Sequence, residues 1–413
     1  MDEVKDGFLL DIRVKNPDSG RKTLLYVRDY QGHSHVVERD MDDHFVSDRL
    51  SFIEADELEK SLRGTSLVQY NPRIFNSGSM YVVVLYGPRE LKSDLEFKKA
   101  TKVYRMVSKP EVSLKLRYPP LLAIKNGTVT MRKVRPEHLL QDTFYGLDIE
   151  LTGMNTDNPL IYMVAGVSGK GNTIFTLYDT GTDWMDIDGH HFRVERADSI
   201  PGLVELVKQD IIEKDPLWIY GHNLMDFDLP HLRRSGDFRI GIGGTEPRIE
   251  GGIPGFHSFR AGKEKNQTDK VVVDGRFVID TLAWSRNNLG LPNNTLPTVA
   301  QNHGIPMEKE IKGDEFDVLG ERAKYDRGVA FKIARYCARD TLTTVRIGQL
   351  DLPQIVIEAI DFETDPTTVC FTGNSVTNYY SVRTQRSLLT LGERRQPSID
   401  MNDKKLVILG MKG

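Results

Sequence analysis

Residues 144–151 read FYGLDIEL, an apolar run rich in β-forming residues that carries two acids, Asp148 and Glu150. Side chains alternate in direction along a strand, so acids two residues apart lie on the same face of it. Two carboxylates on one strand face favour a bound cation, although an isolated Asp-X-Glu is more often a pair of solvated acids on an edge strand. The choice between these interpretations depends on the rest of the chain.

The composition predicts a soluble globular chain of two or three domains, because the 413 residues are 39% hydrophobic and 28% charged. The N-terminus lacks the layout of a signal peptide, and no uncharged apolar run approaches the roughly 20 residues of a membrane helix. We therefore expect an intracellular protein, in the cytoplasm, the nucleoid or a nucleus, with no membrane partner. Its two cysteines, Cys337 and Cys370, are too few for a disulfide framework or a cysteine-based zinc site, so we expect any metal to be held by oxygen.

The net charge of −4 hides an uneven distribution. The stretch from Arg89 to Arg135 contains thirteen basic residues and only four acidic ones. Such a stretch is either an ordinary solvated face or a surface that contacts phosphates, and the sequence leaves both open.

Secondary-structure patterns predict two domains that meet near residue 140. The first is α+β, and the kink at Tyr118-Pro119-Pro120 and the turn at Asn126-Gly127 indicate where it closes. The second is a mixed α/β layer fold, because strands and helices alternate after an antiparallel start. The predicted strands are residues 8–14, 24–30, 80–86, 144–151, 160–167, 173–178, 217–220 and 276–281; the predicted helices are 55–63, 198–215 and 320–349; and the glycine-rich residues 240–270 are expected to form a long mobile loop or a hairpin.

A second polar cluster, residues 220–232 (YGHNLMDFDLPHL), follows a predicted buried strand. This position brings Asn223 and Asp228 to the carboxyl end of the sheet, where open α/β sheets place their sites. His222 and His231 are alternative zinc ligands, but they lack partner ligands at a suitable spacing.

A third cluster lies on the strongest predicted helix, at Tyr336 and Asp340. Residues four apart share one face of a helix, with Cβ atoms roughly 5 to 6 Å apart. The two side chains can therefore serve the same site, although alone they would indicate only a half-buried tyrosine beside an exposed acid.

In this order, the three clusters resemble the motifs of the DEDD exonucleases in their tyrosine variant. The fuller resemblance is to the family B DNA polymerases and covers residues 141 to about 385. It rests also on Lys214-Asp215-Pro216, on residues 291–296 (LPNNTL) and on Thr372-Gly373-Asn374. The resemblance implies an α+β N-terminal domain at residues 1–140, a ribonuclease H-like mixed-sheet exonuclease domain at 141–352, and a segment at 353–413 that resembles the approach to a polymerase palm.

The resemblance also implies a role for each acid. Asp148, Glu150, Asp228 and Asp340 would hold two divalent cations, with Asp148 bridging them, and Tyr336 would orient the attacking water. Carboxylate sites favour Mg²⁺ or Mn²⁺. Two such ions stabilise the attacking hydroxide and the leaving 3′ oxygen of a phosphodiester. Without cations, the clustered acids would raise one another's pKa.

Contacts with nucleic acid follow from the same resemblance. Asn223 and Phe227 would contact the terminal nucleotides, the ring by stacking or wedging. Leu151 stands directly after the Glu of the first motif, where the family commonly has threonine, and Thr152 comes one place later. Thr152 is therefore the candidate for the corresponding nucleic-acid contact.

The residues after Tyr379-Tyr380 contain neither of the two motifs that bind the polymerase metals of the palm. We therefore expect no DNA synthesis by this chain. One expected function is the 3′→5′ proofreading exonuclease of a family B polymerase, acting on single-stranded 3′ ends and primer-template DNA, with a separate palm-containing subunit as a partner. The alternatives are a stand-alone DNA or RNA exonuclease in repair or turnover, and a catalytically silent nucleic-acid-binding domain, against which the complete set of acids argues.

Overall fold

The computed structural model divides the chain into two compact units, which are described separately. The first comprises Met1–Asp40 and Leu114–Tyr379, and the second Met41–Ser113 and Tyr380–Gly413. The expected boundaries at residues 140 and 352 remain predictions. The structure describes residues 4–15, 22–39, 43–47, 50–70, 72–77, 80–87, 95–100, 106–108, 120–153, 159–260, 263–307, 311 and 315–370.

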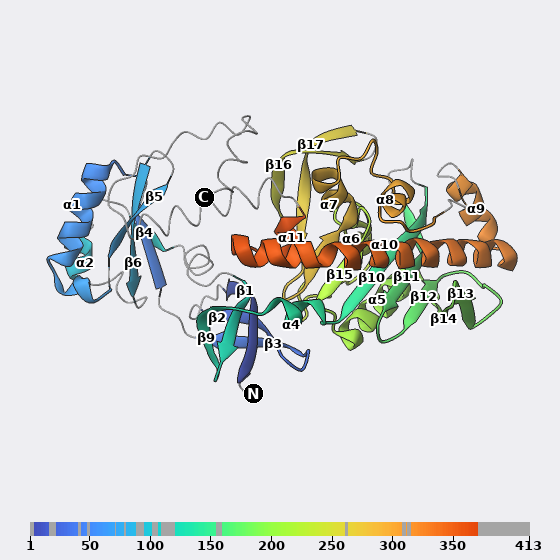
Figure 1. Ribbon diagram of the computed structural model, residues 1–413, viewed down its shortest axis with the longest axis horizontal. Coiled ribbons are helices and arrows are strands. Elements are labelled where there is room, and N and C mark those ends of the chain that lie inside the picture. The colour runs from blue at the N-terminus through green and yellow to red at the C-terminus, as the bar shows by residue number, and fades with distance from the viewer. Residues whose placement is uncertain are drawn as a thin grey trace. The chain divides into compact units, whose positions relative to one another are not determined.

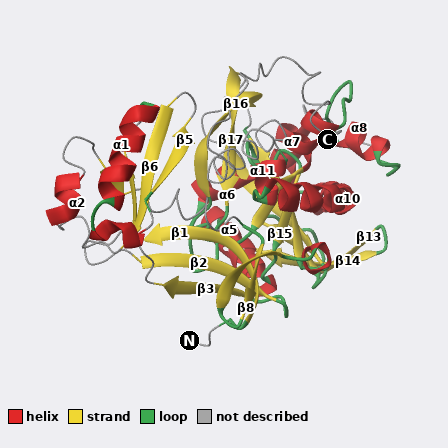
Figure 2. Cartoon of the chain, turned by 60° about the vertical axis from the view of Figure 1, so that its left-hand side comes forward, coloured by secondary structure: helices red, strands yellow, loops and turns green. Residues whose placement is uncertain are grey.

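The first unit begins with a five-stranded antiparallel sheet in the order β3-β2-β1-β8-β9. Figure 2 shows β1, β2, β3 and β8 side by side. Apolar side chains on one face of this sheet, Phe8, Leu10 and Tyr26, belong to the same buried core as the larger sheet that follows. Its strands are β1 Asp6–Lys15, β2 Lys22–Asp29, β3 Ser34–Arg39, β8 Leu122–Lys125 and β9 Thr128–Lys133.

The larger sheet has seven strands in the order β13-β14-β12-β11-β10-β15-β18. The consecutive strands β10, β11 and β12 pair antiparallel, as predicted, whereas β10, β15 and β18 run parallel. The sheet is therefore mixed, which confirms the predicted mixed α/β class. Its strands are β10 Phe144–Thr152, β11 Leu160–Ser168, β12 Asn172–Thr176, β13 Trp184–Ile187, β14 His190–Arg196, β15 Trp218–Gly221 and β18 Phe277–Asp280.

Helices cover both faces of β10. Neighbouring residues of this strand point to opposite sides, so Tyr145 and Gly146 contact different helices. The Tyr145 hydroxyl donates to Asp210 of helix α5 (Ile200–Lys214), 2.7 Å away. On the other face, helix α10 (Arg327–Phe362) crosses β10, β11 and β15 (Figure 1). A Cβ at Gly146 would lie 2.1 Å from Val345 Cγ2 of α10, so only glycine lets the helix approach the strand this closely.

The remaining helices of the first unit are short. They are α4 Pro136–Leu140, α6 Asp228–Ser235, α7 Thr281–Asn288, α8 Leu296–Asn302, α9 Phe316–Ala323 and α11 Pro366–Val369. Within the described ranges, no helix is long and apolar enough to cross a membrane.

The structure differs from the predicted elements at three places. The predicted helix at 320–349 is two helices, α9 and α10, because Asp326 caps a new helix by accepting from the N–H groups of Gly328 and Val329. Helix α10 then continues past Pro353. The hairpin of β13 and β14 was not predicted. The glycine-rich residues 240–270 contain a hairpin, β16 Arg248–Arg260 with β17 Lys263–Val272, which is one of the two predicted alternatives for this region.

Arg28 joins the five-stranded sheet to the elements around the larger sheet. This guanidinium is fully buried and lies 2.6 Å from Asp142 and 2.9 Å from Asp215. Asp215 also pairs with Arg276 at 2.9 Å. Burial alone would raise the pKa of Asp215, but Arg276 and Arg28 outweigh it and hold this pKa below its usual value. The Lys214-Asp215-Pro216 motif is thus part of a structural joint.

The second unit contains a four-stranded sheet in the order β5-β6-β4-β7. Apolar residues of helix α1, Ala55, Leu58 and Leu62, pack with Val83 and Leu85 of β6. The strands are β4 Asp43–Ser47, β5 Arg73–Ser77, β6 Met80–Gly87 and β7 Met106–Ser108, and the helices are α1 Phe52–Arg63, the 3₁₀ helix Ser66–Tyr70 and α2 Leu95–Ala100. Much of the basic stretch from Arg89 to Arg135, and the motif at residues 372–374, lie outside the described residues.

Candidate active site

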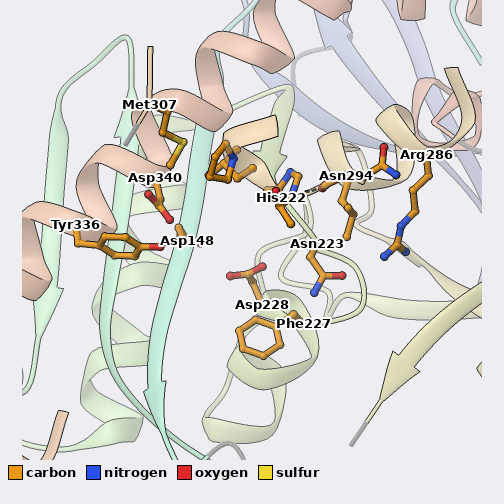
Figure 3. Close-up of a pocket in the computed structure, with 14 residues that line it drawn as sticks. Asp148, His222, Asn223, Phe227, Asp228, Arg286, Asn294, Met307, Tyr336 and Asp340 are labelled. Carbon is orange, nitrogen blue, oxygen red and sulfur yellow. Dashed lines mark hydrogen bonds between the residues drawn. The ribbon is translucent and has the colours of Figure 1, made fainter. Parts of the chain in front are cut away.

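A cavity of about 470 Å³ is lined by residues from all three polar clusters (Figure 3). Asp148 comes from β10. Asn223, Phe227 and Asp228 come from the turn after β15 and the start of α6, and Tyr336 and Asp340 come from α10. The structure therefore brings together six of the eight predicted site residues at this cavity: Asp148, Asn223, Phe227, Asp228, Tyr336 and Asp340.

Asp228 is held against β10 by the backbone. It is the first residue of α6 and only 1% exposed, and its Oδ1 accepts a hydrogen bond from the Ile149 N–H at 3.1 Å. Ile149 separates the two acids of the first cluster. This one bond therefore fixes the second motif beside the first.

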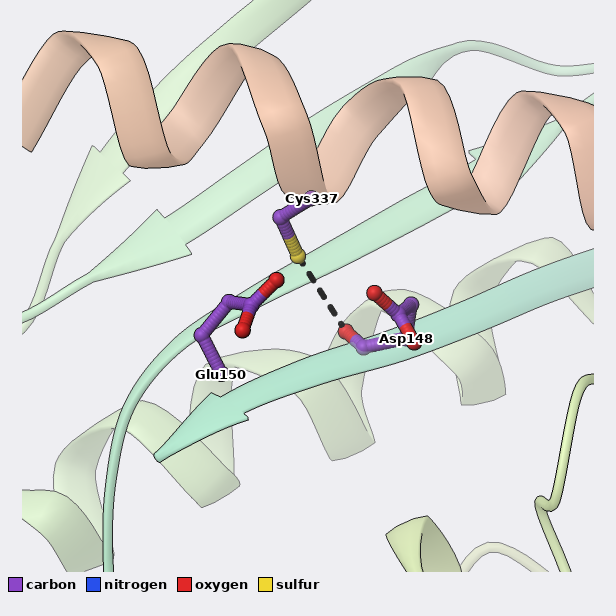
Figure 4. Close-up of side chains that lie close together, drawn as sticks. All are labelled: Asp148, Glu150 and Cys337. Carbon is purple, nitrogen blue, oxygen red and sulfur yellow. Dashed lines mark hydrogen bonds between the residues drawn. The ribbon is translucent and has the colours of Figure 1, made fainter. Parts of the chain in front are cut away.

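Glu150 and Asp148 both face α10 (Figure 4), which is the same-face arrangement that the strand period predicts. The possible ligand atoms of Asp148, Glu150 and Cys337 all lie within 4.8 Å of one another. Glu150 is buried and does not line the cavity itself. The group of these three residues could hold a metal ion by its donor atoms, and its two carboxylates suit Mg²⁺ or Mn²⁺.

Cys337 is the member of this cluster that the oxygen-only prediction did not include. Its thiol lies 3.6 Å from the Asp148 carbonyl oxygen, to which it donates. Burial, with the charges of Asp148 and Glu150 next, raises the pKa of this thiol. In the sequence, only its position between Tyr336 and Asp340 indicated that Cys337 lies near the site, because a lone cysteine on a helix has no metal-binding spacing.

Burial makes it unfavourable for the carboxylates of Asp148 and Asp228 to be ionised when no cation is bound. It raises the pKa of Asp148 well above its usual range, and Asp228 and Asp340 add to the effect. It raises the pKa of Asp228 to about 8, with the charge of Asp280 as the next cause. A divalent cation would relieve both penalties, because it stabilises the ionised carboxylates.

Tyr336 shares the cavity with Asp340. Burial raises the pKa of its phenol well above the usual value, and the charge of Asp340 and a hydrogen bond to it raise it further. The phenol is therefore protonated at neutral pH, so it can donate a hydrogen bond and cannot act as a base.

His222 lines the cavity, and protein groups engage both nitrogens of its ring. Its Nδ1 lies 2.9 Å from Thr281 Oγ1 and its Nε2 lies 3.1 Å from the Asn294 carbonyl oxygen. Both ring nitrogens are thus within hydrogen-bonding distance of protein groups, which argues against a zinc ligand. His231 contacts the Phe227 ring edge to face, with ring centroids 4.9 Å apart.

Thr152 is buried, and the structure does not bring it to the cavity. It packs against Gly320 of α9, where an added Cβ would come within 2.2 Å of the Thr152 methyl group. Its proposed contact with nucleic acid remains a prediction.

The far wall of the cavity comes from α7 and the segment leading into α8. It includes Asn294 and Arg286, whose exposed side chain Figure 3 shows on this wall. Met307, which follows α8, also lines the cavity. We did not predict Arg286, because α7 carries no motif. The nearby LPNNTL segment was the only signal for this wall.

No protein-family model and no curated protein matches the sequence. The fold is nonetheless that of part of a family B DNA polymerase. The solved structure of the family B DNA polymerase from the hyperthermophilic archaeon Pyrobaculum calidifontis is similar, with a TM-score of 0.60 at 14% sequence identity. The similarity covers 92% of this chain and 51% of that one, so the chain spans about half the length of the polymerase.

Proposed function

We propose that this chain is a 3′→5′ exonuclease that removes nucleotides from single-stranded or mismatched DNA 3′ ends, with two divalent cations as cofactors. The observation that carries the proposal is the convergence of Asp148, Asp228, Asp340 and Tyr336 at one cavity, from segments far apart in the sequence. The polymerase-like fold supports it, since that family supplies the resemblance from which the exonuclease roles were predicted.

The protein residues would divide the work as follows. Asp148, Glu150, Asp228 and Asp340 would hold the cations, with Asp148 between the other acids. When bound, the cations would supply a nucleophilic hydroxide and stabilise the leaving 3′ oxygen. Because the Tyr336 phenol keeps its proton, it would position the attacking water by hydrogen bonding.

The cavity walls would bind the end of the strand. Phe227 offers a ring for stacking on an unpaired base, and Asn223 offers an amide for hydrogen bonding. The exposed guanidinium of Arg286 would contact a phosphate of the same strand. A duplex end would have to fray first, and each opened step costs on the order of 1.4 kcal/mol, about tenfold in the reactive population.

Digestion of a 5′-labelled oligonucleotide in Mg²⁺ tests the proposal. We expect a descending ladder with release of mononucleotides, and roughly 10²-fold to 10³-fold faster cutting of single strands and mismatched ends than of matched ends if two or three pairs must open. Chelation by EDTA should stop the reaction. Immediate release of the labelled 5′ nucleotide, or cutting of a circular single strand, would contradict the assigned polarity or the exonuclease class.

A further inference from the structure

Asp280 is the last residue of β18 and does not line the cavity. It pairs with Gly221 of β15 in parallel register and is 3% exposed. Its carboxylate accepts four backbone hydrogen bonds. Oδ1 accepts from Asn223 at 3.1 Å, Leu282 at 3.0 Å and Ala283 at 3.2 Å, and Oδ2 accepts from Met225 at 3.0 Å.

Only two of these bonds belong to helix capping. The N–H groups of Leu282 and Ala283 lie in the first turn of α7, which Asp280 caps. The other two donors, Asn223 and Met225, lie in the turn that follows β15. Helix capping does not require the bonds from Asn223 and Met225, so these two bonds indicate that Asp280 also holds the turn after β15.

The turn after β15 contains a conformation that needs support. Asn223 has a φ of 72°, in the left-handed region that costs a non-glycine residue about 1 kcal/mol or more. The Asn223 side chain lies in the cavity wall (Figure 3), and the turn continues through Phe227 to Asp228. Holding this backbone therefore fixes the direction of an amide that faces the cavity.

Asp280 is poorly suited to be a further cation ligand, because backbone N–H groups already occupy most of the roughly four acceptor sites of an ionised carboxylate. Its Oδ1 accepts three of them and its Oδ2 accepts one. Asp280 is also absent from the residues that line the cavity. Apart from the charge that it places near Asp228, its influence on a substrate passes through the backbone groups that it holds.

We propose that Asp280 is a positioning residue for substrate binding: it holds Asn223 in the left-handed conformation that presents its amide to the terminal nucleotide. The inference rests on the proposed function of this cavity. It goes beyond that function by naming a buried acid whose effect on nucleic-acid binding runs through Asn223.

A double-mutant cycle of Asp280→Asn and Asn223→Ala tests it. Asp280→Asn keeps the shape and one acceptor oxygen but turns an amide NH₂ toward the backbone donors. Each single change should raise KM for a single-stranded oligonucleotide about tenfold, with kcat changed less than about threefold, and the double variant should also show about tenfold, because both changes remove one contact. Additive effects of about a hundredfold, or an unchanged KM for Asp280→Asn, would overturn the proposal.

Asp365→Ala is the control for general destabilisation, because alanine removes the capping acceptor that asparagine would keep. Asp365 caps α11 through Thr368, with bonds of 2.9 Å to the backbone N–H and 2.6 Å to the hydroxyl. Its replacement should weaken the fold without raising KM. An equal rise in KM would mean that general destabilisation explains the Asp280 result, which would also overturn the inference.

Binding titrations of the same four proteins with a single-stranded oligonucleotide in Ca²⁺ separate this inference from the proposed function. If the wild-type chain binds but does not cleave in Mg²⁺, the exonuclease assignment fails while the cycle of dissociation constants still tests Asp280. If the wild type cleaves and the cycle is additive, the inference alone fails.

Discussion

Replacing Asp228 by asparagine should stabilise the metal-free protein. Asp228 is buried, and burial together with the charge of Asp280 raises its pKa to about 8. The unfolded chain has no such environment, so there the carboxyl ionises near pH 4. The folded state therefore binds an extra proton between these values, and stability falls as pH rises through this window, then stays level above about pH 8.

The size of the effect follows from the same values. Each tenfold difference in proton affinity corresponds to about 1.4 kcal/mol, so at pH 7 the penalty is on the order of 4 kcal/mol. Asparagine removes the ionisable group but keeps an oxygen that can accept from the Ile149 N–H. We expect Asp228→Asn to be more stable by about 2 to 4 kcal/mol at pH 8, or a midpoint higher by at least roughly 4 °C.

The assay is thermal unfolding in EDTA at pH 5 and pH 8. The advantage of the variant should shrink at pH 5, and adding Mg²⁺ should stabilise the wild type more than the variant, because the variant has lost a ligand. Asp326→Asn is a control of opposite sign, since hydrogen bonds to the first turn of α10 hold the pKa of Asp326 below its usual value. A variant no more stable than wild type at pH 8, or an advantage independent of pH, would refute the reasoning.

Three further predictions address cleavage, binding and folding. Asp148→Ala or Asp340→Ala should slow digestion at least roughly 10²-fold while single-strand binding in Ca²⁺ persists; undiminished cleavage would remove that residue from the cation site. Arg286→Ala should weaken single-strand binding and reduce the slope of log affinity against log salt by about 0.7, the value for one phosphate contact; an unchanged slope in binding titrations would place the phosphate elsewhere. Arg28→Met should destabilise the first unit by about 3 to 5 kcal/mol, because it leaves two aspartates without this buried partner; urea unfolding measures this, and a loss below about 1 kcal/mol would contradict it.

Local periodicity was sufficient for residues on the same element. The strand period put Asp148 and Glu150 on one face, and the helix period put Tyr336 and Asp340 on one face, as the structure has them. The three clusters, together with the motifs at residues 214–216, 291–296 and 372–374, resembled the family B DNA polymerases, and the structural similarity confirms the polymerase-like fold. The two same-face predictions succeeded because each depends on backbone geometry over a few residues.

Residues that join different elements were not predictable in this way. Cys337 reaches the Asp148 carbonyl, and Arg286 lines the cavity, only because α10 and α7 pack where they do. Thr152 packs against α9, and its contact with nucleic acid stays a prediction. The sequence shows these side chains and their order, but not which of them face one another.

The sequence by itself determined the strand and helix faces that carry the acids, the mixed α/β class and the chemistry that the acids favour. Only the tertiary structure decided that Asp228 lies against Ile149, that Gly146 admits α10, and that Asp280 holds the turn at Asn223. The physical reason is range: side-chain direction is set by local dihedral angles, whereas a cavity is set by close packing between segments that are distant in the chain.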